Sequence, residues 1–242
     1  MLRRPAKTAV VVAHALAQRV SELEPGAMLP PERELIGELQ VGRGTLREAL
    51  RLLELQGVVS VKTGARGGPV VMRPDHRPLA DTLSVFLQSA EAPFIEVVKA
   101  RRAIEADLAR LTAERADQDG IAALRASIEA MRERLGDSDF FLAENLRFHE
   151  ACAVAAGNQV LQVFHSSLKA ISDGHIIGVN YTVRRRSAVV DAHKRITDAI
   201  EASDPDAAYE AMSTHMLEFE RYLTRRYPGV LTRTIRWLLP GA

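Results

Sequence analysis

Hydrophobic positions in the first quarter of the chain follow helical spacing and then change to strand spacing. The first helix is predicted over 8–24 and ends at Pro25-Gly26, with apolar residues every three or four positions: Val11, Val12, Leu16 and Val20. Two shorter helices are expected over 32–39 and 43–56, and strands at 58–61 and 69–71 are expected to flank a glycine-rich tip. Three helices followed by a hairpin predict a winged helix-turn-helix.

Beyond Val71 the spacing is helical nearly to the end of the chain. Asp204 is placed to cap a helix that starts at Pro205, and Gly157 suits the position just past a helix end, with Asn158 capping the next one. Such a segment must bury its apolar stripes as a helical bundle. The predicted helices span 79–90, 93–116, 118–135, 139–156, 159–178, 186–202 and 205–227.

These patterns predict a mainly α protein with two domains. A winged helix-turn-helix is expected over 1–73 and an all-α bundle over 80–227. A polar, proline-bearing linker at 74–79 separates them. A tail at 228–242 has no role that the sequence defines, and packing against a partner subunit is one interpretation of it.

Charge supports this division. Residues 1–77 hold 12 Lys and Arg against 8 Asp and Glu, whereas the remainder holds 20 against 23. A basic N-terminal segment followed by a slightly acidic remainder is typical of a nucleic-acid-binding domain joined to a domain with another function. The longest apolar stretch, Ala9 to Ala17, is interrupted by His14 and is shorter than the roughly 18 residues that span a bilayer. A single cysteine, Cys152, leaves no internal disulfide and suits a reducing cytoplasm.

The third helix carries the residues suited to reading DNA. Arg43 and Arg47 lie four residues apart at its start, and arginine can donate two hydrogen bonds to guanine in the major groove. Arg33 is placed to face phosphates, and the tip at Gly64–Gly68, with Arg66, can approach a minor groove. Each residue alone is better explained as part of a solvated helix face or a plain hairpin loop. A phosphate-binding P-loop at the tip is excluded, because no Gly-Lys-Ser/Thr follows.

Histidines on three predicted helices form a candidate metal site. His149, His193 and His215 lie on separate helices, and Asn145 is one turn before His149 on the same face. Imidazole is the commonest zinc ligand and also serves nickel, copper and iron. Spacing alone does not establish that the three converge, since a single helical histidine is more often a surface or core residue. His165 and His175 are weaker candidates.

Three further features have ordinary alternatives. Arg101 suits a carboxylate ligand, and its alternative is a surface ion pair with Glu105, four residues on. Cys152 is expected to be a small core residue. The run Arg184–Arg186 is expected in a solvated loop, with a role at a pocket edge as the alternative.

The N-terminal segment resembles the DNA-binding domain of the GntR family of bacterial repressors over about residues 8–72. The resemblance is carried by LPPEREL at 29–35 and RGTLREAL at 43–50, followed by Gly57. It implies DNA contacts from Arg33, Arg43, Thr45, Arg47 and Gly64. This chain departs from the family at three positions that usually hold hydroxyl residues, which cap helices or bind phosphates. Backbone N–H groups must therefore provide these contacts here. The three positions are Pro31, Gly42 and Gly44.

The helical segment resembles the FCD ligand-binding domain of the FadR-type branch of that family over about residues 80–225. The resemblance is carried by VKARRAIE at 98–105, AERA at 113–116 and NLRFHE at 145–150, with Gly157-Asn158, His193 and His215. It implies a divalent metal held by one aspartate and three histidines, and a carboxylate ligand near Arg101. His149, His193 and His215 match the histidines, and Asn145 stands where the aspartate is usual. Zinc is expected, with nickel or manganese as alternatives, and the uncharged Asn145 should weaken metal retention.

Together the resemblances imply a homodimeric, cytoplasmic, nucleoid-associated regulator rather than an enzyme. We expect a repressor that a small carboxylate, such as a sugar acid or hydroxy acid, releases from a palindromic operator; activation stays open. One alternative is a metal-dependent enzyme, because catalytic metals keep an open position, although Glu150 is the only carboxylate that the sequence places near the histidines. A nucleoid structural protein without operator preference is the other.

Overall fold

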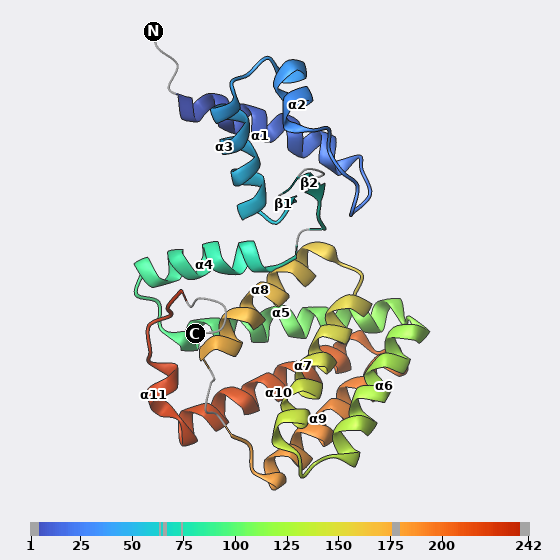
Figure 1. Cartoon of the computed structure of the whole chain (residues 1–242). Coiled ribbons are helices and arrows are strands. Elements are labelled where there is room, and N and C mark those ends of the chain that lie inside the picture. Colours follow the sequence, from blue (N-terminus) through green and yellow to red (C-terminus); the bar gives the residue numbers. More distant parts are fainter. Residues whose placement is uncertain (1–4, 63, 65–66, 74, 176–179, 238–242) are drawn as a thin grey trace. The chain divides into compact units, whose positions relative to one another are not determined.

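The computed structural model describes residues 5–62, 64, 67–73, 75–175 and 180–237. The chain divides into two compact units, Met1–Leu79 and Ala80–Ala242, each of which is described by itself (Figure 1). The first unit combines helices with a two-stranded hairpin, and the described part of the second is helical. The predicted fold class is therefore confirmed.

The N-terminal unit is a winged helix-turn-helix. It contains α1 (Pro5–Ser21), α2 (Glu32–Leu39), α3 (Arg43–Leu55), β1 (Val59–Lys62) and β2 (Gly68–Val71). The strands pair antiparallel, with Val59 opposite Val71 and Lys62 opposite Gly68. Its core includes Leu16, Leu46, Leu50 and Leu53, which the helical spacing placed inward, together with Leu35 of α2.

Backbone geometry shapes the turn between α2 and α3. Gln40 adopts a left-handed conformation with φ of 51°, and its N–H bonds to the carbonyl of Ile36. Neither Pro31 nor Gly42 provides a side-chain cap for the helix that follows it, as expected for residues without a hydroxyl. The first backbone N–H groups of both helices are therefore available to a partner.

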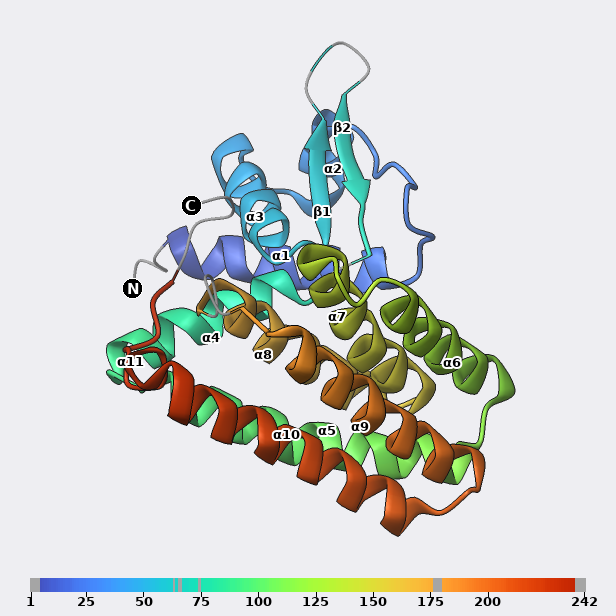
Figure 2. The ribbon, with the colours of Figure 1, turned by 90° about the horizontal axis from the view of Figure 1, so that it is seen from below.

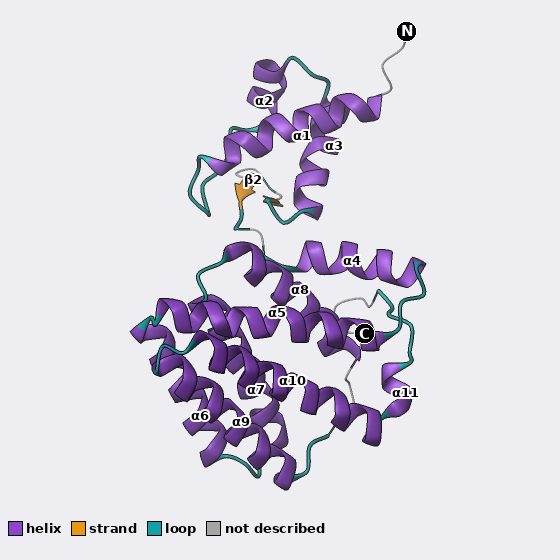
Figure 3. Cartoon of the chain, turned by 180° about the vertical axis from the view of Figure 1, so that it is seen from behind, coloured by secondary structure: helices purple, strands orange, loops and turns teal. Residues whose placement is uncertain are grey.

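The C-terminal unit is a bundle in which α5 is central. Helix α5 packs against α7, α8, α9 and α10, and Figure 2 shows α10 running alongside it. The same arrangement is seen from behind in Figure 3, where strands appear only in the N-terminal unit. None of the helices in the described part of the chain combines the length and hydropathy that crossing a membrane requires. The helices are α4 (Arg77–Ser89), α5 (Phe94–Arg115), α6 (Gln118–Glu133), α7 (Ser138–Ala155), α8 (Gln159–His175), α9 (Val183–Glu201), α10 (Pro205–Arg226) and α11 (Pro228–Leu231).

The predicted helix ends are confirmed at two junctions. Asp204 accepts a hydrogen bond from the N–H of Ala207 at 2.9 Å, and Asn158 accepts one from Leu161 at 3.1 Å. Gly157 has a φ of +66°, and a Cβ there would collide with the guanidinium of Arg115. The positive φ favours glycine at this turn, whereas the exposed Arg115 side chain could move away from a Cβ.

The prediction of a solvated loop at Arg184–Arg186 is wrong. Helix α9 already begins at Val183, because the hydroxyl of Thr182 caps it by accepting from the N–H of Arg185. Arg186 is buried and donates to the carbonyls of Tyr181 and Leu135. The three arginines therefore lie in the first turn of α9, shortly after its cap residue. The next turns of the helix carry buried apolar side chains.

The C-terminal segment packs against its own chain. Ile235 is fully buried, and its N–H bonds to the carbonyl of Ala92 in the turn between α4 and α5. The indole N–H of Trp237 donates to Asp81 on α4 at 3.1 Å. Ile235 and Trp237 therefore contact their own chain, and packing of this segment against a partner subunit stays a prediction.

Candidate functional site

Three histidines from three helices converge in the interior of the C-terminal unit. His149 lies on α7, His193 on α9 and His215 on α10, and one ring nitrogen of each lies within 4.8 Å of the others. The Nε2 atom of His215 is 3.3 Å from that of His193 and 3.4 Å from that of His149. Nitrogens bound tetrahedrally to zinc at 2.0–2.1 Å are about 3.3 Å apart. The predicted convergence is thus present, and two of the three nitrogen pairs lie at the spacing of zinc ligands.

Neighbouring side chains fix the imidazole rings. Phe148 stacks on the His193 ring with centroids 3.8 Å apart and an interplanar angle of 6°. Nδ1 of His149 lies 2.5 Å from Oε2 of Glu105 on α5. A carboxylate at that position favours a proton on Nδ1 and leaves the Nε2 lone pair facing the other two rings. This is how protein metal sites orient their histidine ligands.

Protonation states also suit a cation. Burial lowers the pKa of His193 well below its ordinary value, and His215 and His149 lower it further. Burial likewise lowers the pKa of His215, with His149 adding to the effect and Glu105 opposing it. Both imidazoles are therefore neutral at physiological pH, and a metal ion binds the neutral form. The donor set fits Zn²⁺ or another borderline divalent ion.

Asn145 and Glu150 occupy different places relative to this cluster. Asn145 is half-buried on α7, one turn before His149, and its membership in the site stays a prediction. Glu150 is exposed, so the sequence argument that placed it near the histidines is not supported. The carboxylate that touches the cluster is Glu105, which the sequence suggested only as a partner of Arg101.

Arg101 and Glu105 form a buried ion pair rather than a surface one. Their side chains are 5% and 1% exposed, with Nη2 of Arg101 2.8 Å from Oε1 of Glu105. Burial alone would raise the pKa of Glu105, but Arg101, His149 and His165 hold it well below its ordinary value. The spacing of four residues would also suit an ion pair on an exposed helix face. Because α5 lies at the centre of the bundle, the neighbouring helices enclose this pair instead. Glu105 therefore connects the guanidinium to a histidine of the cluster.

A pocket of about 430 Å³ opens on the surface of α9 and α10. Arg185 lies in its wall, 3.6 Å from Glu218, and its charge contributes to the lowered pKa of His215. Arg185 thus lines a pocket, as the alternative interpretation of the run Arg184–Arg186 suggested. Its lining residues are Arg185, Glu218, Arg221, Tyr222, Arg225 and Arg226.

The buried imidazoles predict a pH-dependent stability. Unfolded histidines take up protons as the pH falls through about 6.5, while His165, with a pKa lowered by burial to about 4, and the more strongly shifted His193 and His215 stay neutral. The unfolded state then binds more protons, so stability falls as the pH falls. Between pH 7.5 and 5.5 we expect a loss of roughly 1 kcal/mol for each imidazole. Glu105, whose pKa is lowered, adds a loss only below about pH 4.5.

Thermal unfolding of chelator-treated protein at a series of pH values measures this. Replacement of the exposed His14 by asparagine should preserve the full pH dependence. An unfolding midpoint that stays constant between pH 7.5 and 5.5 would contradict neutral burial of the three rings.

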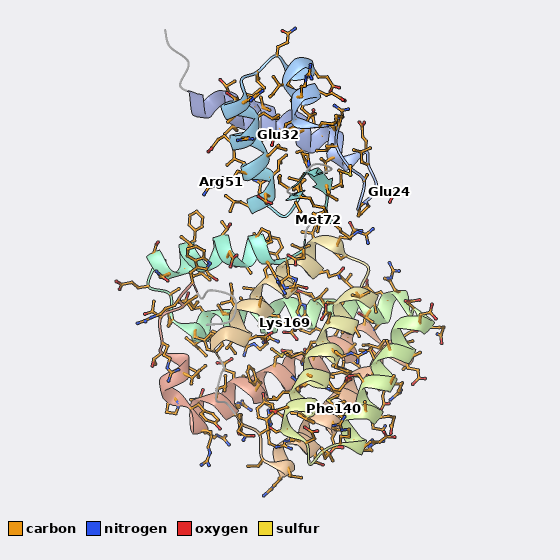
Figure 4. All side chains as sticks on the ribbon, in the orientation of Figure 1. Glu24, Glu32, Arg51, Met72, Phe140 and Lys169 are labelled. Carbon is orange, nitrogen blue, oxygen red and sulfur yellow. The ribbon has the colours of Figure 1, made fainter. Side chains whose placement is uncertain are left out.

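Three arginines of the N-terminal unit lie around one hollow. A hollow of about 290 Å³ between α2 and α3 is lined by Glu32, Arg33, Ile36, Arg43 and Arg47. Nε of Arg47 lies 3.1 Å from Glu32, which Figure 4 labels at the start of α2, and the Arg47 side chain is 71% exposed. Glu32 can therefore orient Arg47 while leaving it accessible. Sequence reasoning did not assign Glu32 a role.

The remaining candidates for DNA contact differ in what the structure describes. Thr45 is half-buried in the first turn of α3. Gly64, at the wing tip, has a φ of +111°, which side chains rarely adopt. Arg66 lies outside the described residues. Contacts of all these residues with DNA stay predictions.

A winged helix-turn-helix joined to a helical unit with a three-histidine cluster defines a class of bacterial regulators. The GntR family of bacterial regulatory proteins matches residues 8–67, and the FCD domain matches residues 96–218. The HTH-type transcriptional repressor NanR of Citrobacter rodentium is 31% identical over 211 residues, covering 82% of this chain and 77% of that one. NanR of Cronobacter sakazakii is 29% identical over 238 residues, covering 88% and 85%. Streptococcus agalactiae GntR has a similar structure, with a TM-score of 0.64, 25% identity and coverage of 90% and 100%.

The chain belongs to the GntR family and carries an FCD domain. It is a DNA-binding transcription regulator, and both resemblances seen in the sequence are confirmed. These comparisons give no support to the metal-dependent enzyme.

Proposed function

We propose that the protein is a metabolite-responsive repressor whose effector is a small carboxylate bound beside the three-histidine cluster. The observation that carries this proposal is the continuous contact from His149 through Glu105 to Arg101 in the bundle interior. A buried guanidinium beside a candidate metal site is suited to an anion, because a buried charge without a charged partner is costly.

Each residue has a distinct role in this proposal. His149, His193 and His215, with Asn145, would hold Zn²⁺, or Ni²⁺ or Mn²⁺, and the bound ion would supply positive charge to the effector. Glu105 orients His149 and receives two nitrogens of Arg101 at one of its oxygens. A guanidinium has five N–H donors, so Arg101 retains donors for a carboxylate.

The effector must favour one arrangement of the protein to alter DNA binding. Arg101, Glu105 and the three histidines come from α5, α7, α9 and α10, so an effector that bridges them would favour one packing of these helices. We propose that this packing lowers operator affinity. Turnover of the effector has no part in the proposal.

We propose that a homodimer binds an inverted repeat, because two identical readers related by a two-fold axis match a palindromic operator. The outward side of α8 supports this, since it exposes apolar side chains at helical spacing that a second copy would cover: Val160, Val163 and Phe164.

The test combines ligand binding with operator release. An operator is first selected from random duplexes by the wild-type protein, and an inverted repeat is expected. Small carboxylates are then screened by thermal shift with and without Zn²⁺, Ni²⁺ or Mn²⁺, and acids that bind are tested for release of the selected DNA. We expect release without consumption of the acid, which NMR measures. An acid that is consumed, or that binds without affecting DNA affinity, would contradict the proposal.

Arg101→Lys is the matched variant, because it keeps the charge beside Glu105 and loses the planar, two-point contact. It should bind the selected DNA as the wild type does, while its affinity for the acid falls about tenfold or more. Unchanged acid affinity would remove Arg101 from the effector site.

A further inference from the structure

Arginine side chains surround the pocket on the surface of α9 and α10. Its volume of about 430 Å³ is in the range of small-molecule sites. The lining contains four guanidinium groups and one carboxylate, which gives a net charge of +3. We call it the arginine pocket, and its lining residues are Arg185 from α9 and Glu218, Arg221, Tyr222, Arg225 and Arg226 from α10.

Three arginines of α10 enter this pocket without an acidic partner in the described part of the chain: Arg221, Arg225 and Arg226. Arg132 on α6 differs, because it pairs with Glu129. The carbonyl groups at the end of α10 favour cations in its last turn, which holds Arg225 and Arg226. They do not account for Arg221, which lies one turn earlier and is repelled by Arg225, four residues on. A bound anion would offset this repulsion.

Arg185 reaches the same pocket from α9 and is incompletely paired. Its side chain is 15% exposed, and its buried Nε has no hydrogen-bond partner among the described residues. Nη1 lies 3.6 Å from Glu218, which is longer than a hydrogen bond. The guanidinium lies over the ring of Tyr222, whose hydroxyl donates to the carbonyl of Asn180 at 2.6 Å. Arg185 is therefore held at the pocket wall with donors that an acceptor could use.

The charge and the donors of the arginine pocket favour phosphate groups. The planar guanidinium donates pairs of hydrogen bonds that match the oxygens of a phosphate. A phosphate monoester carries a charge of about −1.5 to −2 at neutral pH and three strong acceptor oxygens. A carboxylate carries one charge and two oxygens. A wall with a net charge of +3 is therefore better matched by one or two phosphate groups than by a single carboxylate.

We infer that the arginine pocket is a second ligand site, which binds a phosphorylated small molecule. Its lining includes none of the three cluster histidines, and neither Arg101 nor Glu105. The inference therefore stands independently of the carboxylate effector. It gives the helical unit a site for a second class of metabolite on its surface.

Calorimetric titration of the full-length protein with inorganic pyrophosphate, inorganic phosphate and acetate tests the inference. Pyrophosphate should bind about tenfold or more tightly than acetate, with phosphate between them. Arg185→Gln and Arg221→Gln should each weaken pyrophosphate binding about fivefold to tenfold. Glu218→Gln should strengthen it about threefold, because the carboxylate repels the anion. Damage to the fold would not produce that gain.

Two variants control for charge and for the interior site. Arg184→Gln removes an exposed arginine from the same turn of α9, outside the pocket lining, and should leave pyrophosphate affinity within about twofold. Arg101→Lys should also bind pyrophosphate as the wild type does. A random-sequence DNA duplex separates a small molecule from the DNA backbone as the source of phosphate, and Arg221→Gln should bind this duplex with unchanged affinity.

Four outcomes would overturn the inference. The first is no preference for pyrophosphate over acetate, and the second is an equal loss in Arg184→Gln and Arg185→Gln. A loss confined to Arg101→Lys would place the anion in the interior of the bundle. A loss of duplex affinity in Arg221→Gln would assign the pocket to the DNA backbone. A failed screen of carboxylates would contradict the proposed function and leave this inference intact.

Discussion

Alanine at Arg43 or Arg47 is expected to weaken binding to the selected operator by about 1–3 kcal/mol, or roughly 5- to 150-fold, and to relax its base preference. Both arginines extend from the start of α3 and line the hollow shared with α2. In a winged helix-turn-helix, that end of the recognition helix faces the base edges. A guanidinium can donate two hydrogen bonds to guanine, and alanine can donate none.

Lysine variants separate base contacts from charge. Arg47→Lys should keep most of the dependence of affinity on salt concentration, because the charge remains, but lose discrimination between bases. Arg33→Ala should instead lower affinity for all sequences alike and reduce the salt slope by about 1, as expected for a phosphate contact. Fluorescence anisotropy over a range of salt concentrations measures both.

Arg132→Ala is the control, since this arginine is exposed on α6 and pairs with Glu129, three residues before it. It should bind the operator as the wild type does. If the Arg47 variants match it, the assignment of α3 as the reading helix is wrong.

Loss of one cluster histidine is expected to have the largest effect on the C-terminal unit. His215→Ala should abolish stable metal binding, because Nε2 of His215 lies between those of His193 and His149. Glu105→Gln should weaken metal binding by about 10–100-fold, the usual cost of losing the group that orients a histidine ligand. Asn145→Asp should strengthen it, because the aspartate adds a negative charge near the ion.

Elemental analysis after dialysis against Zn²⁺, together with competition by a chelator, measures these changes. His14→Asn provides a histidine control in the other unit and should retain wild-type metal content. Retention of stoichiometric metal by His215→Ala would show that the three rings do not form the site.

The limits of sequence prediction follow from how far apart the interacting residues are. Apolar spacing and caps at Asp204 and Asn158 are local, so the helices and their order could be predicted. The convergence of three histidines depends on how α7, α9 and α10 cross, and only the family resemblance indicated it.

The contact of Glu105 with His149 had no sequence signal, because it joins two helices that are distant along the chain. The burial of Arg186 was missed for a related reason. Its partners are the backbone carbonyls of Tyr181 and Leu135. Every residue has such a carbonyl, so the residue types do not indicate which ones will accept these hydrogen bonds.

The C-terminal segment contains an intrinsic fluorophore. Trp237 is the one tryptophan in the sequence, and its indole is anchored to Asp81 on α4, the helix that directly follows the link to the DNA-binding unit. The ring is half exposed, so its emission is sensitive to small changes in its surroundings. A change in the contact between Trp237 and α4 can thus be followed by fluorescence in the unmodified protein, in real time and without an attached dye.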